Sequence, residues 1–206
     1  MPKYVVRALG VGEYPVARRI IATAYADQPF AYTMFGVLAI DRFVGMIGEY
    51  ESWPGAADPV VVAVELAGGP VVGVGQATMP GYCHLCDEPT ADPDGNITTH
   101  PVEIEFQAAC ARAHRSQHLL PHARLSGIAV DPFLRGSGVG PLVVTGLLER
   151  LAAAGAGTVV LECLTARERF YERFGFGRLT DFADPGAPGL RSVLMRLDQD
   201  APVATT

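Results

Sequence analysis

The chain has 206 residues, which is enough for one domain with a well-buried core and does not require a second domain. Hydrophobic residues make up 49% of it and charged residues 18%, a composition typical of a globular protein rather than a disordered one. The net charge of −6, with no basic run, argues against nucleic acid as a partner. The sequence has no signal-peptide pattern and no apolar stretch of the roughly 18 residues that a membrane span needs, so we expect a cytoplasmic protein without a membrane partner.

The first eighty residues alternate between strand and helix patterns. In chain order they predict a strand at 4–9, helices at 13–26 and 37–51, and strands at 60–66 and 71–79. The second helix carries Ile40, Phe43, Val44 and Ile47 at the spacing of one helical face. The turn Gly68-Gly69-Pro70 indicates that the last two strands form a hairpin.

An irregular stretch rich in Gly, Pro and Asp follows over residues 80–99. A helix is then predicted over residues 101–118, because acidic residues occupy its first turn and basic ones its last, as the helix dipole favours. In chain order the remainder predicts a strand at 125–130, a helix from about 141, a strand at 158–163, a short helix at 166–174, and strands near 177–180 and 190–197. We therefore expect one domain over residues 1–200 and a flexible tail over 201–206.

The segment from Val130 to Gly140, V-D-P-F-L-R-G-S-G-V-G, joins a predicted strand to a predicted helix. Backbone N–H groups at a helix N-terminus have no internal partners, and the helix dipole adds partial positive charge there. Gly136, Gly138 and Gly140 let the main chain approach a phosphate closely, and Arg135 adds a positive charge. This turn therefore predicts a site for a phosphate-bearing cofactor.

Three kinds of cofactor site compete for this turn. A nucleoside-triphosphate P-loop requires a Lys after the glycines, and none follows them here. A dinucleotide fingerprint requires a third glycine where this chain has Pro141. The third candidate is a site for the pyrophosphate of an acyl-coenzyme A, and a glycine-rich turn without a binding function is a further alternative.

Two motifs resemble the GNAT N-acetyltransferase superfamily. Its signature [QR]-x-x-G-x-[GA], after a strand that ends in A-V-x-P, is similar to Arg135–Gly140 preceded by Ala129–Pro132. Its F-Y-x-x-x-G-F motif is matched by Phe170, Tyr171, Gly175 and Phe176. The resemblance is specific from Leu125 to Phe176, plausible over residues 4–79 and absent over 80–121, which would form an insertion.

The resemblance implies an α/β fold with a mixed central β-sheet flanked by helices and an insertion before the cofactor-binding strand. It also implies acetyl-CoA as cosubstrate and direct attack by the amine of a small molecule on the thioester. A protein or peptide N-acetyltransferase and a non-catalytic acyl-CoA-binding module remain alternatives. The fold is also compatible with a homodimer.

Site residues follow from the same resemblance. The strand over residues 125–130 is expected to diverge from its neighbour and to pair with the pantetheine arm, and Tyr171 is expected to protonate the departing thiolate. The expected cofactor contacts are Ile128, Ala129, Val130, Arg135, Gly136, Ser137, Gly138, Val139 and Gly140.

The general base is not identified by the sequence. Some relatives carry Glu or His on the cofactor strand at the positions of Arg124 and Ser126, and arginine stays protonated and cannot act as a base. Glu65, His122 and Glu105 are substitutes that could act through water. Arg124 and Ser126 are instead predicted to face the substrate, and Arg124 could hold a substrate carboxylate.

Cysteines and histidines are concentrated around the insertion. Cys83 and Cys86 form a C-x-x-C motif, and His114 and His118 lie four residues apart on the predicted helix, a spacing that suits zinc. The gap from Cys86 to His114 is much longer than in a zinc finger, and no thioredoxin-like context supports a redox pair. The interpretation preferred from sequence is reduced thiols and no metal, with zinc as the alternative.

Overall fold

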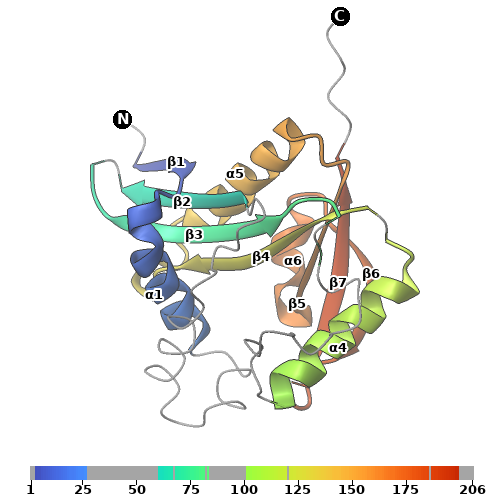
Figure 1. The fold of residues 1–206 in the computed structure, drawn as a ribbon. Coiled ribbons are helices and arrows are strands. Elements are labelled where there is room, and N and C mark those ends of the chain that lie inside the picture. Colours follow the sequence, from blue (N-terminus) through green and yellow to red (C-terminus); the bar gives the residue numbers. More distant parts are fainter. Residues whose placement is uncertain are drawn as a thin grey trace, which may run out of the picture.

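The computed structural model describes residues 3–26, 60–66, 68–81, 83, 101–119, 121–185 and 187–199, and every structural statement below refers to them. The predicted helix over 37–51 and the tail over 201–206 lie outside the described residues. The described residues form a mixed sheet flanked by helices (Figure 1), which confirms the predicted fold class. None of the described helices combines the length and apolar character that a bilayer crossing requires.

The described part of the chain contributes seven strands to the sheet, in the order β1-β2-β3-β4-β5-β7-β6. Their bounds are β1 Tyr4–Ala8, β2 Val60–Leu66, β3 Val71–Thr78, β4 Ala123–Val130, β5 Thr158–Leu164, β6 Gly177–Ala183 and β7 Arg191–Asp198. Neighbouring strands are antiparallel except β4 and β5, which are parallel. The predicted hairpin around the Gly68 turn is confirmed by the antiparallel pairing of β2 with β3.

The helices cover both faces of this sheet. Their bounds are α1 Tyr14–Tyr25, α4 Pro101–Ser116, α5 Val139–Ala153 and α6 Glu168–Glu172, with short 3-10 helices at Val11–Glu13, Pro132–Leu134 and Thr165–Arg167. Helix α1 buries Ile20 and Ile21 with Val74 of β3, while α5 buries Val143 and Leu147 in the larger core on the other face. Successive residues of a strand point to opposite faces, so β3 contributes to both cores.

Two glycines of β3 let α5 approach the sheet closely. A Cβ atom on Gly73 would lie 2.5 Å from Cγ1 of Val139, and one on Gly75 would lie 2.5 Å from Cγ1 of Val143. Any larger side chain would therefore push the helix away from the strand. This contact fixes the start of α5, which follows the glycine-rich turn, against the centre of the sheet.

The parallel join between β4 and β5 is very short. Only Ala123 with Val159 and Arg124 with Val160 are paired, and beyond Arg124 the two strands diverge (Figure 1). On its other side β4 stays paired with β3 and contains a bulge, where Gly127, at φ +60°, and Ile128 lie opposite one residue of β3. From Leu125 onward, no described strand covers the β5 side of β4.

Element ends differ from the predicted ones where turn geometry decides them. The tyrosine helix is shorter than the predicted 166–174, because its first turn is a 3-10 helix and Gly175 takes φ +90°. Helix α4 ends at Ser116 rather than at residue 118, because His118 adopts φ +52°. Strand β4 begins at Ala123 instead of Leu125, and β6 continues to Ala183 instead of residue 180.

Candidate active site

A cavity of about 970 Å³ occupies the divergence between β4 and β5. Its wall is formed by β4 from Arg124 to Val130, by β5 from Leu161 to Leu164, and by residues of α1, α6 and the glycine-rich turn. It therefore joins in one continuous space the segments that carry the two sequence motifs.

The glycine-rich turn presents open backbone N–H groups to this cavity. Gly136 and Gly138 have φ of +79° and +93°, conformations that favour glycine, and Gly138 is the N-cap of α5. No side chain caps that helix start, so its first N–H groups are available to an anion. Pro141 lies in the first turn of α5, where its missing N–H is not needed.

Most of the predicted cofactor contacts line the cavity. These are Ile128, Ala129, Val130, Arg135, Gly136, Gly138 and Gly140. The side chains of Ser137 and Val139 are engaged elsewhere. The Ser137 hydroxyl donates to the carbonyl of Leu134 at 2.6 Å and accepts from the phenol of Tyr4 at 3.1 Å, and Val139 packs over Gly73 in the core.

Tyr171 lies in the cavity wall on α6, next to the diverging strands. The ring of Phe170 contacts it edge-on with centroids 4.9 Å apart, and that of Phe176 does so at 6.2 Å. Burial, reinforced by the nearby Tyr25 phenol, raises the pKa of Tyr171 above the usual value of a phenol. Its hydroxyl therefore remains protonated at neutral pH and can act as a proton donor.

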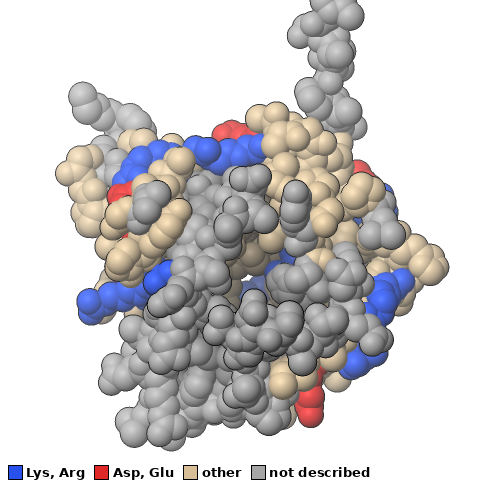
Figure 2. Space-filling view, in the orientation of Figure 1, with Lys and Arg blue, Asp and Glu red and all other residues tan. Residues whose placement is uncertain are grey.

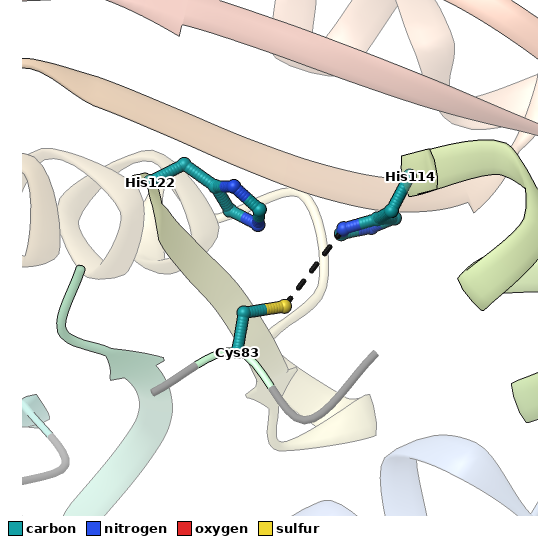
Figure 3. Close-up of side chains that lie close together, drawn as sticks. All are labelled: Cys83, His114 and His122. Atoms are coloured by element: carbon teal, nitrogen blue, oxygen red, sulfur yellow. Dashed lines mark hydrogen bonds between the residues drawn. The ribbon is translucent and has the colours of Figure 1, made fainter. Parts of the chain in front are cut away.

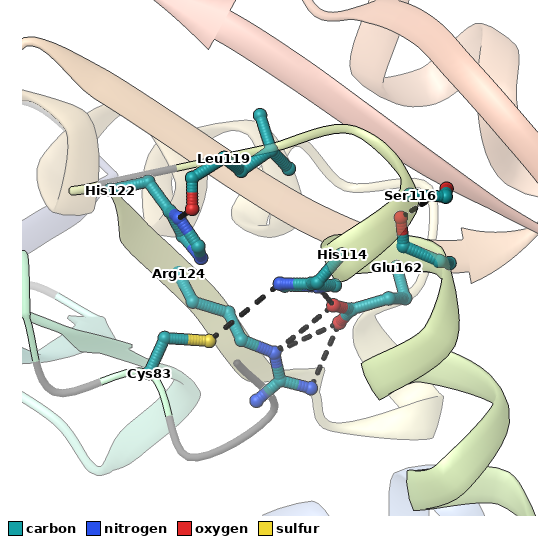
Figure 4. A network of polar contacts seen from close by, with 8 residues as sticks. Cys83, His114, Ser116, Leu119, His122, Arg124 and Glu162 are labelled. Atoms are coloured by element: carbon teal, nitrogen blue, oxygen red, sulfur yellow. Dashed lines mark hydrogen bonds and ion pairs between the residues drawn. The ribbon is translucent and has the colours of Figure 1, made fainter. Parts of the chain in front are cut away.

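Arg124 and Ser126, the two residues predicted to face the substrate, also line the cavity. Nε and Nη2 of Arg124 lie 2.9 and 2.8 Å from Oε2 of Glu162 on β5, forming a buried ion pair (Figure 4). The same carboxylate accepts a hydrogen bond from Nε2 of His114. Burial opposes ionisation of Glu162, but the charge of Arg124 and the hydrogen bonds from His114 and Arg124 hold its pKa at about 2.

Glu162 is a cavity residue that the sequence analysis missed. It lies within the apolar run of β5, and its side chain is only 3% exposed. A single acid inside such a run is a signal for a buried partner, although sequence alone does not name that partner. Asp184, which follows β6, is a second buried acid in the cavity wall and accepts a hydrogen bond from the Ser192 hydroxyl at 2.6 Å.

None of the three suggested substitutes for the base is placed in the cavity wall by the described residues. Glu105 is exposed on α4, and His122 is buried with its Nδ1 donating to the carbonyl of Leu119 at 3.1 Å. The side chain of Glu65 lies outside the described residues. Among the described residues, the acids in the cavity wall are Glu162 and Asp184.

Arginines also contribute to the cavity wall, one of them from the glycine-rich turn. Arg135, Arg167 and Arg173 contribute to its wall, and the guanidinium of Arg135 donates to the carbonyl of Ala24 on α1 at 3.1 Å. Figure 2 shows basic side chains in separate groups on the viewed face, including a row near β1, rather than one continuous basic surface. The positive charge beside the cavity is thus local, within a chain whose net charge is −6.

Comparison with known proteins agrees with this geometry. The model of a family described as the acetyltransferase (GNAT) family matches residues 11–176. None of the curated protein sequences compared with the chain matches it significantly.

Solved structures share the fold at low sequence identity. Agmatine N-acetyltransferase superposes with a TM-score of 0.68 at 14% identity, covering 96% of this chain and 100% of its own. A mosquito arylalkylamine N-acetyltransferase like 5b superposes with a TM-score of 0.66 at 16% identity, covering 95% of this chain and 100% of its own. A Corynebacterium glutamicum structure, described as histone acetyltransferase HPA2 and related acetyltransferase, gives 0.62 at 19% identity, covering 98% and 99%.

Proposed function

Because the chain belongs to the GNAT acetyltransferase family, we propose that it transfers an acetyl group from acetyl-CoA to the amine of a small molecule by direct attack. The observation that carries this proposal is the single cavity that joins the glycine-rich turn, the uncovered edge of β4 and the Tyr171 phenol. A phosphate site, a strand edge and a proton donor are the three elements that acyl transfer from a coenzyme A thioester requires.

The glycine-rich turn would hold the pyrophosphate of the cosubstrate. Its N–H groups and the dipole of α5 supply positive potential, and Arg135 adds a full charge beside them. The pantetheine arm would then run along β4 beside Ile128, Ala129 and Val130, where no described strand competes for the edge. A backbone N–H of this edge would stabilise the thioester oxygen as negative charge develops on it, an effect worth about 3 kcal/mol.

Bond making and proton transfer would proceed on the same side of the cavity. The amine nitrogen forms a bond to the carbonyl carbon while the carbon–sulfur bond breaks, and the Tyr171 hydroxyl gives its proton to the departing sulfur. An amine that arrives as an ammonium ion would first give a proton to water, and its nitrogen would give up a second proton as the amide forms, which restores the Tyr171 hydroxyl.

The structural neighbours support an amine acceptor of small size, since two of them are described as acting on agmatine and on arylalkylamines. A substrate carboxylate held by Arg124 would share the guanidinium with Glu162. Under that hypothesis Arg124→Met raises KM for the true acceptor far more than for acetyl-CoA. An equal rise in both KM values would contradict it.

The proposal is tested by a thiol-release assay with acetyl-CoA as donor. The acceptors are a panel of amines, amino acids, polyamines, aminoglycosides and N-terminal peptides. Turnover of a small amine is the expected result. Turnover of peptides alone would instead assign a protein or peptide N-acetyltransferase. Tight binding of acetyl-CoA by calorimetry, without turnover of any acceptor, would favour a non-catalytic acyl-CoA-binding module.

A further inference from the structure

Three side chains of the types that bind metals lie close together behind the wall of the cavity. Cys83, His114 and His122 are 6%, 1% and 2% exposed, and one ligand atom of each lies within 4.8 Å of the others. They come from three separate segments: Cys83 follows β3, His114 belongs to α4, and His122 directly precedes β4. Figure 3 shows the three side chains pointing toward one common space. We call this set the Cys-His-His cluster.

The hydrogen bonds around the cluster orient its histidines toward a common space. Glu162 accepts from Nε2 of His114, and Nδ1 of that ring faces Sγ of Cys83 at 3.8 Å (Figure 4). Burial opposes a charge on His114, but its contacts with Cys83 and Glu162 raise its pKa to about 9, so a metal bound at Nδ1 would displace a proton. His122 donates from Nδ1 to the carbonyl of Leu119 at 3.1 Å, which puts its lone pair on Nε2. A histidine that binds zinc usually donates its other N–H to a carboxylate or a backbone carbonyl, and the cluster has one partner of each kind.

The spacing is also close to that of a zinc site. Zinc bonds of about 2.3 Å to sulfur and about 2.0–2.1 Å to nitrogen, in tetrahedral geometry, place the ligand atoms about 3.5 Å apart. The 3.8 Å from Cys83 to His114 is near this value, and small side-chain rotations bring atoms within 4.8 Å to it. A thiolate with two imidazoles suits zinc better than calcium or magnesium, which prefer oxygen.

We propose that Cys83, His114 and His122 bind a zinc ion, with the fourth coordination position left for a further ligand. This set replaces the one suggested by the H-x3-H spacing, since His118 lies beyond the end of α4 with an exposed side chain. It also reverses the interpretation of the cysteines that the sequence favoured. Cys86 lies outside the described residues and is no part of the proposed site.

The site would tie the insertion to the sheet. A zinc ion there joins the segment after β3 to α4 and to the start of β4, and it fixes His114 against Glu162. Glu162 in turn positions Arg124 in the cavity wall. None of the three ligands lines the cavity itself, so their role is to position that wall rather than to contact substrate.

Metal content of the full chain tests the proposal directly. We expect about one zinc ion per chain by elemental mass spectrometry after expression with zinc and removal of loosely bound metal. Cobalt(II) replacing the zinc should give the visible bands of a tetrahedral site and a near-ultraviolet thiolate-to-cobalt band. These readouts need no substitution and no activity, so they hold whether or not the acetyltransferase proposal is correct.

Matched substitutions locate the site. Cys83→Ser and His122→Gln should weaken zinc binding by more than about tenfold, measured by competition with a chromophoric chelator. Cys110→Ser is the thiol control, because Cys110 is buried beside Cys83 but lies outside the cluster. His118→Asn is the histidine control, because asparagine tolerates the left-handed conformation of that residue. Both controls should keep the metal.

Three results would overturn the proposal. The first is a zinc-reconstituted protein that holds no metal and gives no thiolate-to-cobalt band. The second is equal loss of metal in the Cys110 and Cys83 variants. The third is preferential binding of copper(II) with the intense visible absorption of a trigonal Cys-His-His copper site, which would assign the cluster to another metal.

Discussion

Tyr171 lies in the cavity wall and its raised pKa keeps it protonated at neutral pH, and we propose it as the catalytic acid. We expect Tyr171→Phe to lower kcat by about 10²-fold, because the departing thiolate then loses its proton donor while the ring and its contacts with Phe170 and Phe176 remain. The dissociation constant of acetyl-CoA should change little. Steady-state kinetics and calorimetry measure the two quantities on the same preparation.

Tyr25 offers a matched control for that substitution. It is a second buried phenol in the cavity wall, and burial raises its pKa as well. Tyr25→Phe should reduce kcat far less than Tyr171→Phe, because the proposed mechanism assigns the proton transfer to Tyr171 and none to Tyr25. Comparable losses in both variants would mean that the hydroxyl of Tyr171 has no special role in proton transfer.

The Arg124–Glu162 ion pair should matter for folding before it matters for catalysis. Both side chains are largely buried, at 13% and 3% exposed. Arg124→Met leaves the Glu162 carboxylate buried without its main counter-charge, which should lower the free energy of unfolding by about 3 kcal/mol. Urea denaturation followed by circular dichroism measures this change.

A second substitution distinguishes two causes of this loss of stability, lost packing and an unpaired buried charge. Glu162→Gln, added to Arg124→Met, removes the buried charge and keeps an oxygen that can accept the hydrogen bond from His114. The double variant should recover at least about 1 kcal/mol relative to Arg124→Met alone. If it is as unstable as the single variant, or less stable, the loss comes from packing and not from the uncompensated carboxylate.

At the scale of elements, the close approach of α5 to β3 depends on Gly75. A Cβ atom there would lie 2.5 Å from Cγ1 of Val143 and 2.7 Å from Cδ1 of Leu147. Gly75→Ala should therefore lower the free energy of unfolding by about 1–3 kcal/mol, measured by urea denaturation, because α5 must move outward. It should also weaken acetyl-CoA binding, since the start of α5 moves with the helix.

The matched control is Gly177→Ala. Gly177 also belongs to a strand, but a Cβ atom there meets nothing within 4 Å. The free energy of unfolding of the Gly177→Ala variant should stay within about 0.5 kcal/mol of the wild-type value. A similar loss at both positions would show that the effect comes from the strand residue itself and not from the helix contact.

The sequence predicted those elements whose signals are local. The hairpin of β2 and β3, the strand β5 and the glycine-rich turn are all specified by patterns a few residues long. The partner of Glu162 could not be predicted, because the short pairing of β4 with β5 brings Arg124 to it across the sheet. The H-x3-H spacing of His114 and His118 suggests one helical face because the predicted helix continues to residue 118, whereas α4 ends at Ser116.

At the scale of the whole molecule, the proposed zinc ion should stabilise the fold. At a free zinc concentration about 100-fold above its dissociation constant, binding adds about 2.7 kcal/mol, which corresponds to a rise in Tm of about 5–10 °C for a chain of this length. Differential scanning calorimetry with and without a chelator measures the difference. The His122→Gln variant should show no such shift, and an unchanged Tm in the wild type would contradict the prediction.

The two-pair join between β4 and β5 also has a mechanical consequence. It divides the sheet into two leaves, β1 to β4 and β5 to β7, and among the described strands the backbones of the two leaves are hydrogen-bonded to each other only around Ala123 and Arg124. We therefore expect any rotation of one leaf relative to the other to occur along the line of these two pairs. A small rotation about this line would change the distance between the diverging ends of β4 and β5 much more than it would change the internal structure of either leaf. The width of the cleft is thus set along the line of the β4–β5 pairing, where the guanidinium of Arg124 forms an ion pair with Glu162 of the opposite leaf.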